Sequence, residues 1–80
     1  MNILVDEAVS AACQGGSVTI RFKSGHKLSF PTAGNPRLNG ASDADLNNIE
    51  LSPFGIHWPT LDEDLSFEGI MRGDYGHRRV

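Results

Sequence analysis

The chain has 80 residues, of which 39% are hydrophobic and 21% are charged, and its formal net charge is −3. This length excludes more than one domain and this composition excludes a disordered tail, while the single cysteine, Cys13, excludes an internal disulfide. No apolar run approaches the roughly 18 residues that span a bilayer, so we expect one soluble, cytoplasmic domain over residues 1–80, either a monomer or a homodimer.

The charged residues are separated along the chain. Residues 17–37 contain four Lys or Arg and no acid, whereas residues 43–68 contain seven acids and no Lys or Arg. We therefore expect a polarised surface, whose acidic part is either a solvated face or a face that meets a basic partner. The candidate partner-binding residues are Asp43, Asp45, Glu50, Asp62, Glu63, Asp64 and Glu68.

Residues 2–14 have the pattern of a helix. Asn2 is a suitable N-cap, alanines are frequent, apolar residues recur at helical spacing, and Gly15-Gly16 would end the helix. We expect an atypical N-terminal helical segment over residues 1–16. Whether residues 2–5 are helix or strand stays open, because two of them are β-branched.

Residues 17–30 have the pattern of a hairpin, with apolar and polar residues in alternation. The register that keeps one face apolar has a three-residue loop over residues 23–25, with Gly25 where φ is positive. This register gives the pairs Val18 with Phe30, Ile20 with Leu28, and Phe22 with His26.

A loop and a short helix are expected next. Pro31 ends the second strand, because it has no N–H for the ladder. Residues 31–41 form a loop in which Leu38 turns toward the core. Ser42 caps a helix that ends near Asn48, with two early aspartates suited to the positive helix terminus.

The last part of the chain predicts two more strands, near residues 49–52 and 56–58, and a final short helix capped by Ser66. Residues 60–65 read as a loop and residues 74–80 as a flexible tail. The expected fold is therefore α+β, with one small antiparallel sheet of three to four strands and short helices, the N-terminal one included.

No arrangement of residues predicts catalysis. His57, Asp62 and Asp64 have donor atoms that suit a transition metal, but their spacing matches no metal motif. Ser66 and Cys13 lie in no nucleophile motif, and a phosphate-binding glycine loop is absent. We expect no catalytic residue, metal or cofactor. Trp58 is expected in the core and the acids at 62–64 outside it.

The stretch from Gly55 to Gly73 resembles a known family. Three segments carry the resemblance: Gly55-Ile56-His57-Trp58-Pro59, Leu61-Asp62-Glu63-Asp64-Leu65-Ser66, and Glu68-Gly69-Ile70-Met71-Arg72-Gly73. They are similar to the C-terminal signature of the domain-of-unknown-function 2442 family of small bacterial and phage-borne proteins, and the similarity covers roughly residues 17–76. The start of the chain departs from that pattern, where a leading strand would be expected.

The resemblance implies an α+β fold without an established enzymatic activity. Some family members look like modules joined to a helix-turn-helix domain, and others stand beside a second small gene, as in toxin–antitoxin pairs. We therefore expect a non-enzymatic, antitoxin-like or regulator-like module that binds a basic surface of another protein. The alternative is an acidic nucleic-acid mimic, such as an anti-CRISPR protein. Direct nucleic-acid binding by Arg21, Lys23 and Lys27 is disfavoured by the negative net charge.

Overall fold

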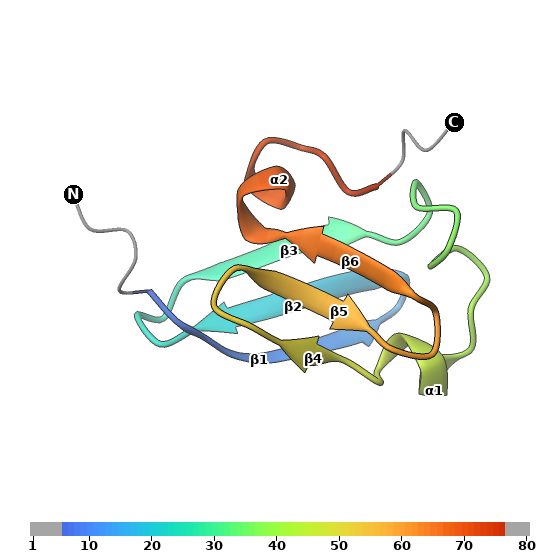
Figure 1. The fold of residues 1–80 in the computed structure, drawn as a ribbon, viewed down its shortest axis with the longest axis horizontal. Coiled ribbons are helices and arrows are strands. Elements are labelled where there is room, and N and C mark those ends of the chain that lie inside the picture. Colours follow the sequence, from blue (N-terminus) through green and yellow to red (C-terminus); the bar gives the residue numbers. More distant parts are fainter. Residues whose placement is uncertain (1–5, 77–80) are drawn as a thin grey trace.

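The computed structural model describes residues 6–76, which form two small antiparallel sheets and two short helices (Figure 1). The elements in chain order are β1 (Ala8–Gln14), β2 (Ser17–Phe22), β3 (Lys27–Pro31), α1 (Asp43–Leu46), β4 (Glu50–Leu51), β5 (Gly55–Trp58), β6 (Glu63–Ser66) and α2 (Phe67–Met71). The first sheet has the order β1-β2-β3 and the second β4-β5-β6. The expected α+β fold with a single sheet of three to four strands is therefore wrong: the described residues form mainly β structure, in two three-stranded sheets with only two short helices.

The expected N-terminal helix is wrong within the described residues, because Ala8–Gln14 forms strand β1. β1 pairs antiparallel with β2, from Ala8 opposite Phe22 to Gln14 opposite Ser17. Gly15 and Gly16 have φ of 60° and 82°, so they form the two-residue turn of a hairpin and do not end a helix. The open question about residues 2–5 and the proposed cap at Asn2 lie outside the described residues.

The hairpin of β2 and β3 confirms the predicted register. Val18 pairs with Phe30 and Ile20 pairs with Leu28. The loop has three residues, since the Phe22 amide donates to the His26 carbonyl at 2.9 Å and Gly25 has a φ of 100°. On the inward side of this hairpin, Val18, Ile20, Phe22 and Phe30 are buried and Leu28 is half-buried, whereas most of the outward side chains are polar, as one-sided burial of an antiparallel sheet requires.

Strand β6 was not expected, because residues 60–65 read as a loop. The loop is shorter and ends at Asp62, the only described non-glycine residue with positive φ, at 53°. This left-handed residue closes the turn after Trp58 and lets Glu63–Ser66 pair with β5. Along β6, Glu63 and Leu65 are buried and Asp64 and Ser66 are exposed, which is the alternation of a half-buried strand.

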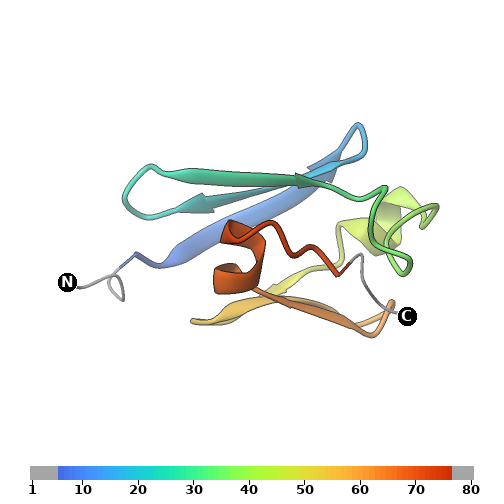
Figure 2. The same ribbon diagram turned by 90° about the horizontal axis from the view of Figure 1, so that it is seen from above.

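The core lies between the two sheets, which form two layers in Figure 2. Phe30 of the first sheet packs edge-on against Trp58 of the second, with ring centroids 6.5 Å apart. The Trp58 indole N–H donates to the Leu46 carbonyl at 3.0 Å, which satisfies its polar group. Leu38 is fully buried, as predicted. The buried hydrophobic residues are Val18, Ile20, Phe22, Phe30, Leu38, Leu46, Ile56, Trp58, Leu65, Phe67 and Ile70.

Both helices begin at the predicted serines. The Asp45 amide donates to Ser42 Oγ at 3.1 Å, and the Gly69 amide donates to Ser66 Oγ at 2.9 Å. α2 lies at the edge formed by β3 and β6, between the two layers (Figures 1 and 2). No helix in residues 6–76 is both long enough and apolar enough to cross a membrane.

Candidate functional site

The seven acids predicted as a partner-binding surface have different environments. Asp43, Glu50, Asp62, Asp64 and Glu68 are exposed, and Asp45 is half-buried. Glu63 is only 2% exposed, so the expectation that all of residues 62–64 lie outside the core is wrong for this residue. Its position on β6 makes it point inward, like Leu65 two residues later.

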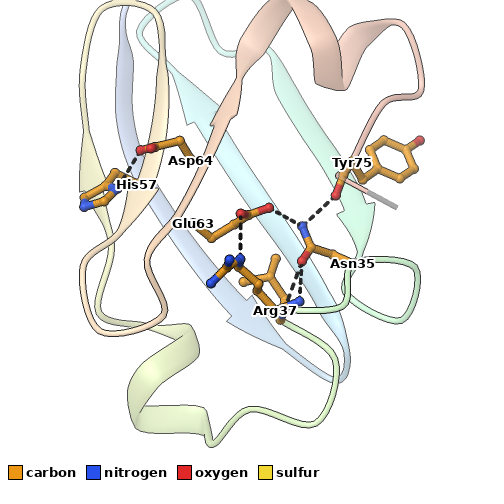
Figure 3. A network of polar contacts seen from close by, with 7 residues as sticks. Asn35, Arg37, His57, Glu63, Asp64 and Tyr75 are labelled. Atoms are coloured by element: carbon orange, nitrogen blue, oxygen red, sulfur yellow. Dashed lines mark hydrogen bonds and ion pairs between the residues drawn. The ribbon is translucent and has the colours of Figure 1, made fainter. Parts of the chain in front are cut away.

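Glu63 belongs to a buried polar network (Figure 3). Asn35 Nδ2 donates to Glu63 Oε2 at 2.8 Å and to the Tyr75 carbonyl at 2.7 Å. Arg37 Nε lies 3.8 Å from Glu63 Oε1. Asn35 Oδ1 accepts hydrogen bonds from the backbone amides of Arg37 and Leu38 at 2.8 and 3.1 Å.

This network has a structural role. It joins three segments that are distant in sequence: the loop that contains Asn35, strand β6, and the end of the described chain at Tyr75. Gly76 packs directly on it, because a Cβ there would lie 2.5 Å from Asn35 Nδ2 and 2.8 Å from Glu63 Oε2. Glu63 is therefore removed from the candidate contact surface.

The outer face of the second sheet carries a row of three ionisable side chains. Glu50 of β4 lies opposite His57 of β5, which lies opposite Asp64 of β6. His57 Nδ1 is 2.6 Å from Asp64 Oδ1 (Figure 3). Within the described part of the chain, no group of three or more His, Cys, Asp or Glu side chains is placed to hold a metal ion. The row is thus a polar face with two acids that flank one imidazole.

An apolar groove of about 470 Å³ lies next to this face. Phe54 and Met71 stand at it with 76% and 66% of their surface exposed. Beneath them, the Phe22 and Phe67 rings pack edge-on with centroids 5.3 Å apart. The groove, here called the Phe54 groove, is lined by Asp6, Phe22, Pro53, Phe54, Ser66, Phe67, Glu68 and Met71.

The Phe54 groove adjoins a second, more open hollow of about 210 Å³ on the outer face of the second sheet. Both are lined by Phe54 and Ser66, and the more open one also includes His57 and Asp64. An exposed aromatic side chain therefore stands between an acidic sheet face and an apolar groove, and the three features form one surface.

The turn that carries Phe54 is fixed on both sides. Ser52 Oγ accepts from the Phe54 amide at 3.3 Å and from the Gly55 amide at 3.1 Å. The Phe54 carbonyl accepts from the Phe67 amide at 2.9 Å, which joins the turn to the start of α2. Gly55 lies against the Leu65 backbone so closely that no Cβ would fit. The turn was predicted from the sequence, but the exposure of Phe54 was not, although an aromatic residue between Pro53 and Gly55 has no strand to bury it.

The outer face of the first sheet has the opposite charge. Arg21 and Lys27 are both exposed and lie directly opposite each other. With Ser10, Thr19 and other small or polar residues, they line a hollow of about 400 Å³. Because the two sheets pack through their inner faces, this basic face points away from the acidic one, as the charge distribution along the chain predicted.

Cys13 on β1 is half-buried beside α1. Burial raises the pKa of its thiol, and the negative charge of Asp43 raises it further. A raised pKa lowers the thiolate fraction at neutral pH, which is the opposite of what an activated nucleophile needs.

Comparisons with known proteins place this architecture in context. The family model described as "Protein of unknown function (DUF2442)" matches residues 8–76. A crystal structure of a protein of unknown function from Rhodospirillum rubrum is similar over 91% of this chain and 93% of its own, with 34% identity and a TM-score of 0.78. The solution structure of an uncharacterized protein from Chromobacterium violaceum is similar over 88% of this chain and 68% of its own, with 27% identity and a TM-score of 0.75. Among curated proteins, no match was found.

Proposed function

The chain belongs to the DUF2442 family of proteins of unknown function, and we propose that it is a non-enzymatic protein-interaction module. It binds a basic surface of another protein in the cytoplasm and acts in the manner of an antitoxin or a regulator. The observation that carries this proposal is the single surface in which the acidic face of the second sheet adjoins the Phe54 groove.

The charges on this surface support an attraction to basic partners. Residues 43–71 contain no Lys or Arg, and five of their acids are exposed. A surface with one sign of charge steers an oppositely charged partner and accelerates association. The row of Glu50, His57 and Asp64 places Asp64 in the same hollow as Phe54, and Glu50 lies further along the row, on the other side of His57.

The apolar part of the surface can stabilise the complex after the charges have attracted the partner. Aromatic residues and Met are enriched in the centres of protein interfaces, where a few of them supply most of the binding energy. Phe54 and Met71 are exposed aromatic and thioether side chains of this kind. Asp6, Ser66 and Glu68 add polar side chains to the lining of the same groove.

Neutralisation of two acids tests this proposal. A tagged chain is purified from the cells that express it, and the affinity of any co-purified protein is measured for the wild type and for E50Q/D64N. We expect about a three- to tenfold slower association and a flatter dependence on salt, because two steering charges are lost. The matched control, R21Q/K27Q, removes two charges from the opposite face and should leave the association unchanged. Equal effects of both double variants, or the absence of any bound protein, would contradict the proposal.

A second candidate function is the acidic nucleic-acid mimic, such as an anti-CRISPR protein, that occupies a basic nucleic-acid-binding groove. It is favoured by the same run of residues 43–71, which contains seven Asp or Glu and no Lys or Arg. Competition separates the two candidates. Added nucleic acid would displace the chain from its partner if it is a mimic, and would leave binding unchanged if the partner uses a surface unrelated to nucleic acid.

A further inference from the structure

We infer that the Phe54 groove binds an apolar side chain of a partner segment that carries Lys or Arg on both sides of that side chain. This inference rests on the proposed function and goes further, because it states which chemistry the partner presents and where it docks. It follows from three properties of the groove: its exposed apolar walls, the acids around it, and the fixed position of Phe54.

The apolar walls create a driving force for docking. Phe54 and Met71 are 76% and 66% exposed, and Phe22 and Phe67 are buried beneath them. Removal of apolar surface from water on binding is favourable roughly in proportion to the area that a partner covers. A partner side chain that covers most of Phe54 therefore contributes roughly tenfold or more in affinity.

Acids stand on two sides of this apolar centre. Asp6 and Glu68 line the groove itself. On the other side of Phe54, the adjoining hollow is lined by Asp64, with Glu50 in the same row of the sheet. A segment that crosses Phe54 thus passes acids before and after its apolar residue, and basic residues at those places match this pattern.

Of the two acids that line the groove, Asp6 is held in place by hydrogen bonds and Glu68 has only a weak ion pair. Asp6 accepts from the Ser24 hydroxyl at 3.0 Å and from the Ser24 amide at 3.2 Å, which fixes its carboxylate at the rim. Glu68 pairs with Arg72 at 3.5 Å, but both side chains are highly exposed. An exposed pair of this type is worth little, so a basic partner residue can replace Arg72 at small cost.

The backbone that carries Phe54 is preorganised. The two hydrogen bonds to Ser52 Oγ and the bond from the Phe67 amide hold this backbone before any partner arrives. Since less conformational freedom is lost on docking, more of the apolar burial remains as binding energy.

The test uses synthetic nonapeptides on the full chain, with Met71 methyl and Phe54 ring resonances as readouts. The first peptide has a central Leu with Lys and Arg on both sides, and the second has the same Leu with Glu on both sides. We expect the basic peptide to shift both groove resonances and the acidic peptide to leave them in place. No shift with either peptide, or equal shifts with both, would overturn the inference.

Two variants make the test specific. F54S should weaken binding of the basic peptide by about tenfold. V9S is the matched control, because Val9 is the other large exposed hydrophobic residue among those described, at 55%, and does not line the groove. Equal weakening by both variants would overturn the inference. Two results without peptide would also overturn the inference. If the Met71 resonance shifted with protein concentration, a second copy of the chain would occupy the groove. If Met71 showed a cross-relaxation contact with residues 1–5, the chain's own terminus would occupy it.

The inference about the Phe54 groove and the proposed function can be refuted independently of each other. If a natural partner loses affinity in E50Q/D64N while neither peptide binds the groove, only the inference about the Phe54 groove is refuted. If the basic peptide binds the groove but no cellular protein binds the chain, only the proposed function is refuted.

Discussion

Replacement of Asn35 by Ala should destabilise the fold more than any other truncation of a polar side chain in its loop. Asn35 is fully buried and makes four hydrogen bonds, to Glu63, to the Tyr75 carbonyl, and from two backbone amides. A neutral hydrogen bond contributes about 1 kcal/mol net, and one to a charged group about 1.5–3 kcal/mol. Because partial rehydration offsets part of the sum, we expect a loss of about 3–5 kcal/mol.

This loss is large relative to the whole stability of such a chain. A domain of this size has a free energy of unfolding of roughly 4–12 kcal/mol. Urea unfolding followed by the fluorescence of Trp58 measures the change, since that indole is fully buried in the core. The midpoint should fall while the slope with urea stays the same, because the surface exposed on unfolding is unchanged.

The matched control is N39A in the same loop. Asn39 is exposed, and only its backbone amide takes part in a hydrogen bond, to the Asn35 carbonyl at 2.8 Å. Its truncation should change the unfolding free energy by less than about 0.5 kcal/mol. If N35A lost less than about 1 kcal/mol, or no more than N39A, the network would not be what joins the loop to β6.

Three further predictions concern single positions. Gly76→Ala should lower the free energy of unfolding by about 2 kcal/mol or more, since φ is +83° and the new methyl group meets two buried polar atoms. The control is Gly40→Ala, which has the same φ but no atoms close to the new methyl group and should cost only about 1 kcal/mol. Asp62→Val should destabilise by about 1–2 kcal/mol in the same assay, because φ is positive, whereas Asp62→Gly should not. Burial and the charge of Asp43 raise the pKa of the Cys13 thiol above its value in the unfolded chain. The protonated thiol therefore contributes to the free energy of unfolding in full below the unfolded-state pKa, and this contribution is lost as the pH rises through the folded-state pKa. Alkylation at pH 8–9 should be slower in the native than in the unfolded chain, and faster in D43N; equal rates would contradict this.

The parts of the fold that were predictable depend on local sequence signals. The β2–β3 register follows from alternation on both sides of Gly25, since only one register keeps Val18 and Ile20 on the same face as their partners. Both helix starts follow from a serine cap, which needs only the next three residues.

β1 was missed because its signals were ambiguous. The register shift between Ala8 and Ser10 places the inward residues at Ala8 and Ala11, three apart, which imitates helical spacing. The two glycines that follow suit either a helix end or a hairpin turn. Pairing with β2 decided between them, and that contact is not visible in the local sequence.

The candidate site was only partly predictable for a related reason. An acid-rich stretch suggests exposure, but the burial of Glu63 depends on Asn35, which lies 28 residues earlier in the chain. The exposed acids of the second sheet were predicted as candidates. The position of Phe54 at a groove was not predictable, because the groove forms only when the turn, α2 and the end of β2 come together.

The most direct test of the proposed function is site-specific photo-crosslinking in cells. A photoreactive residue is placed at position 54 in one variant and at position 12 in another, since Ala12 is exposed on the outer face of the first sheet. We predict that position 54 crosslinks to one protein, through a peptide with an apolar residue flanked by Lys or Arg, and that position 12 does not. Equal crosslinking from both positions, or an acidic peptide at position 54, would contradict the proposal that this chain binds a basic partner through its acidic and apolar surface.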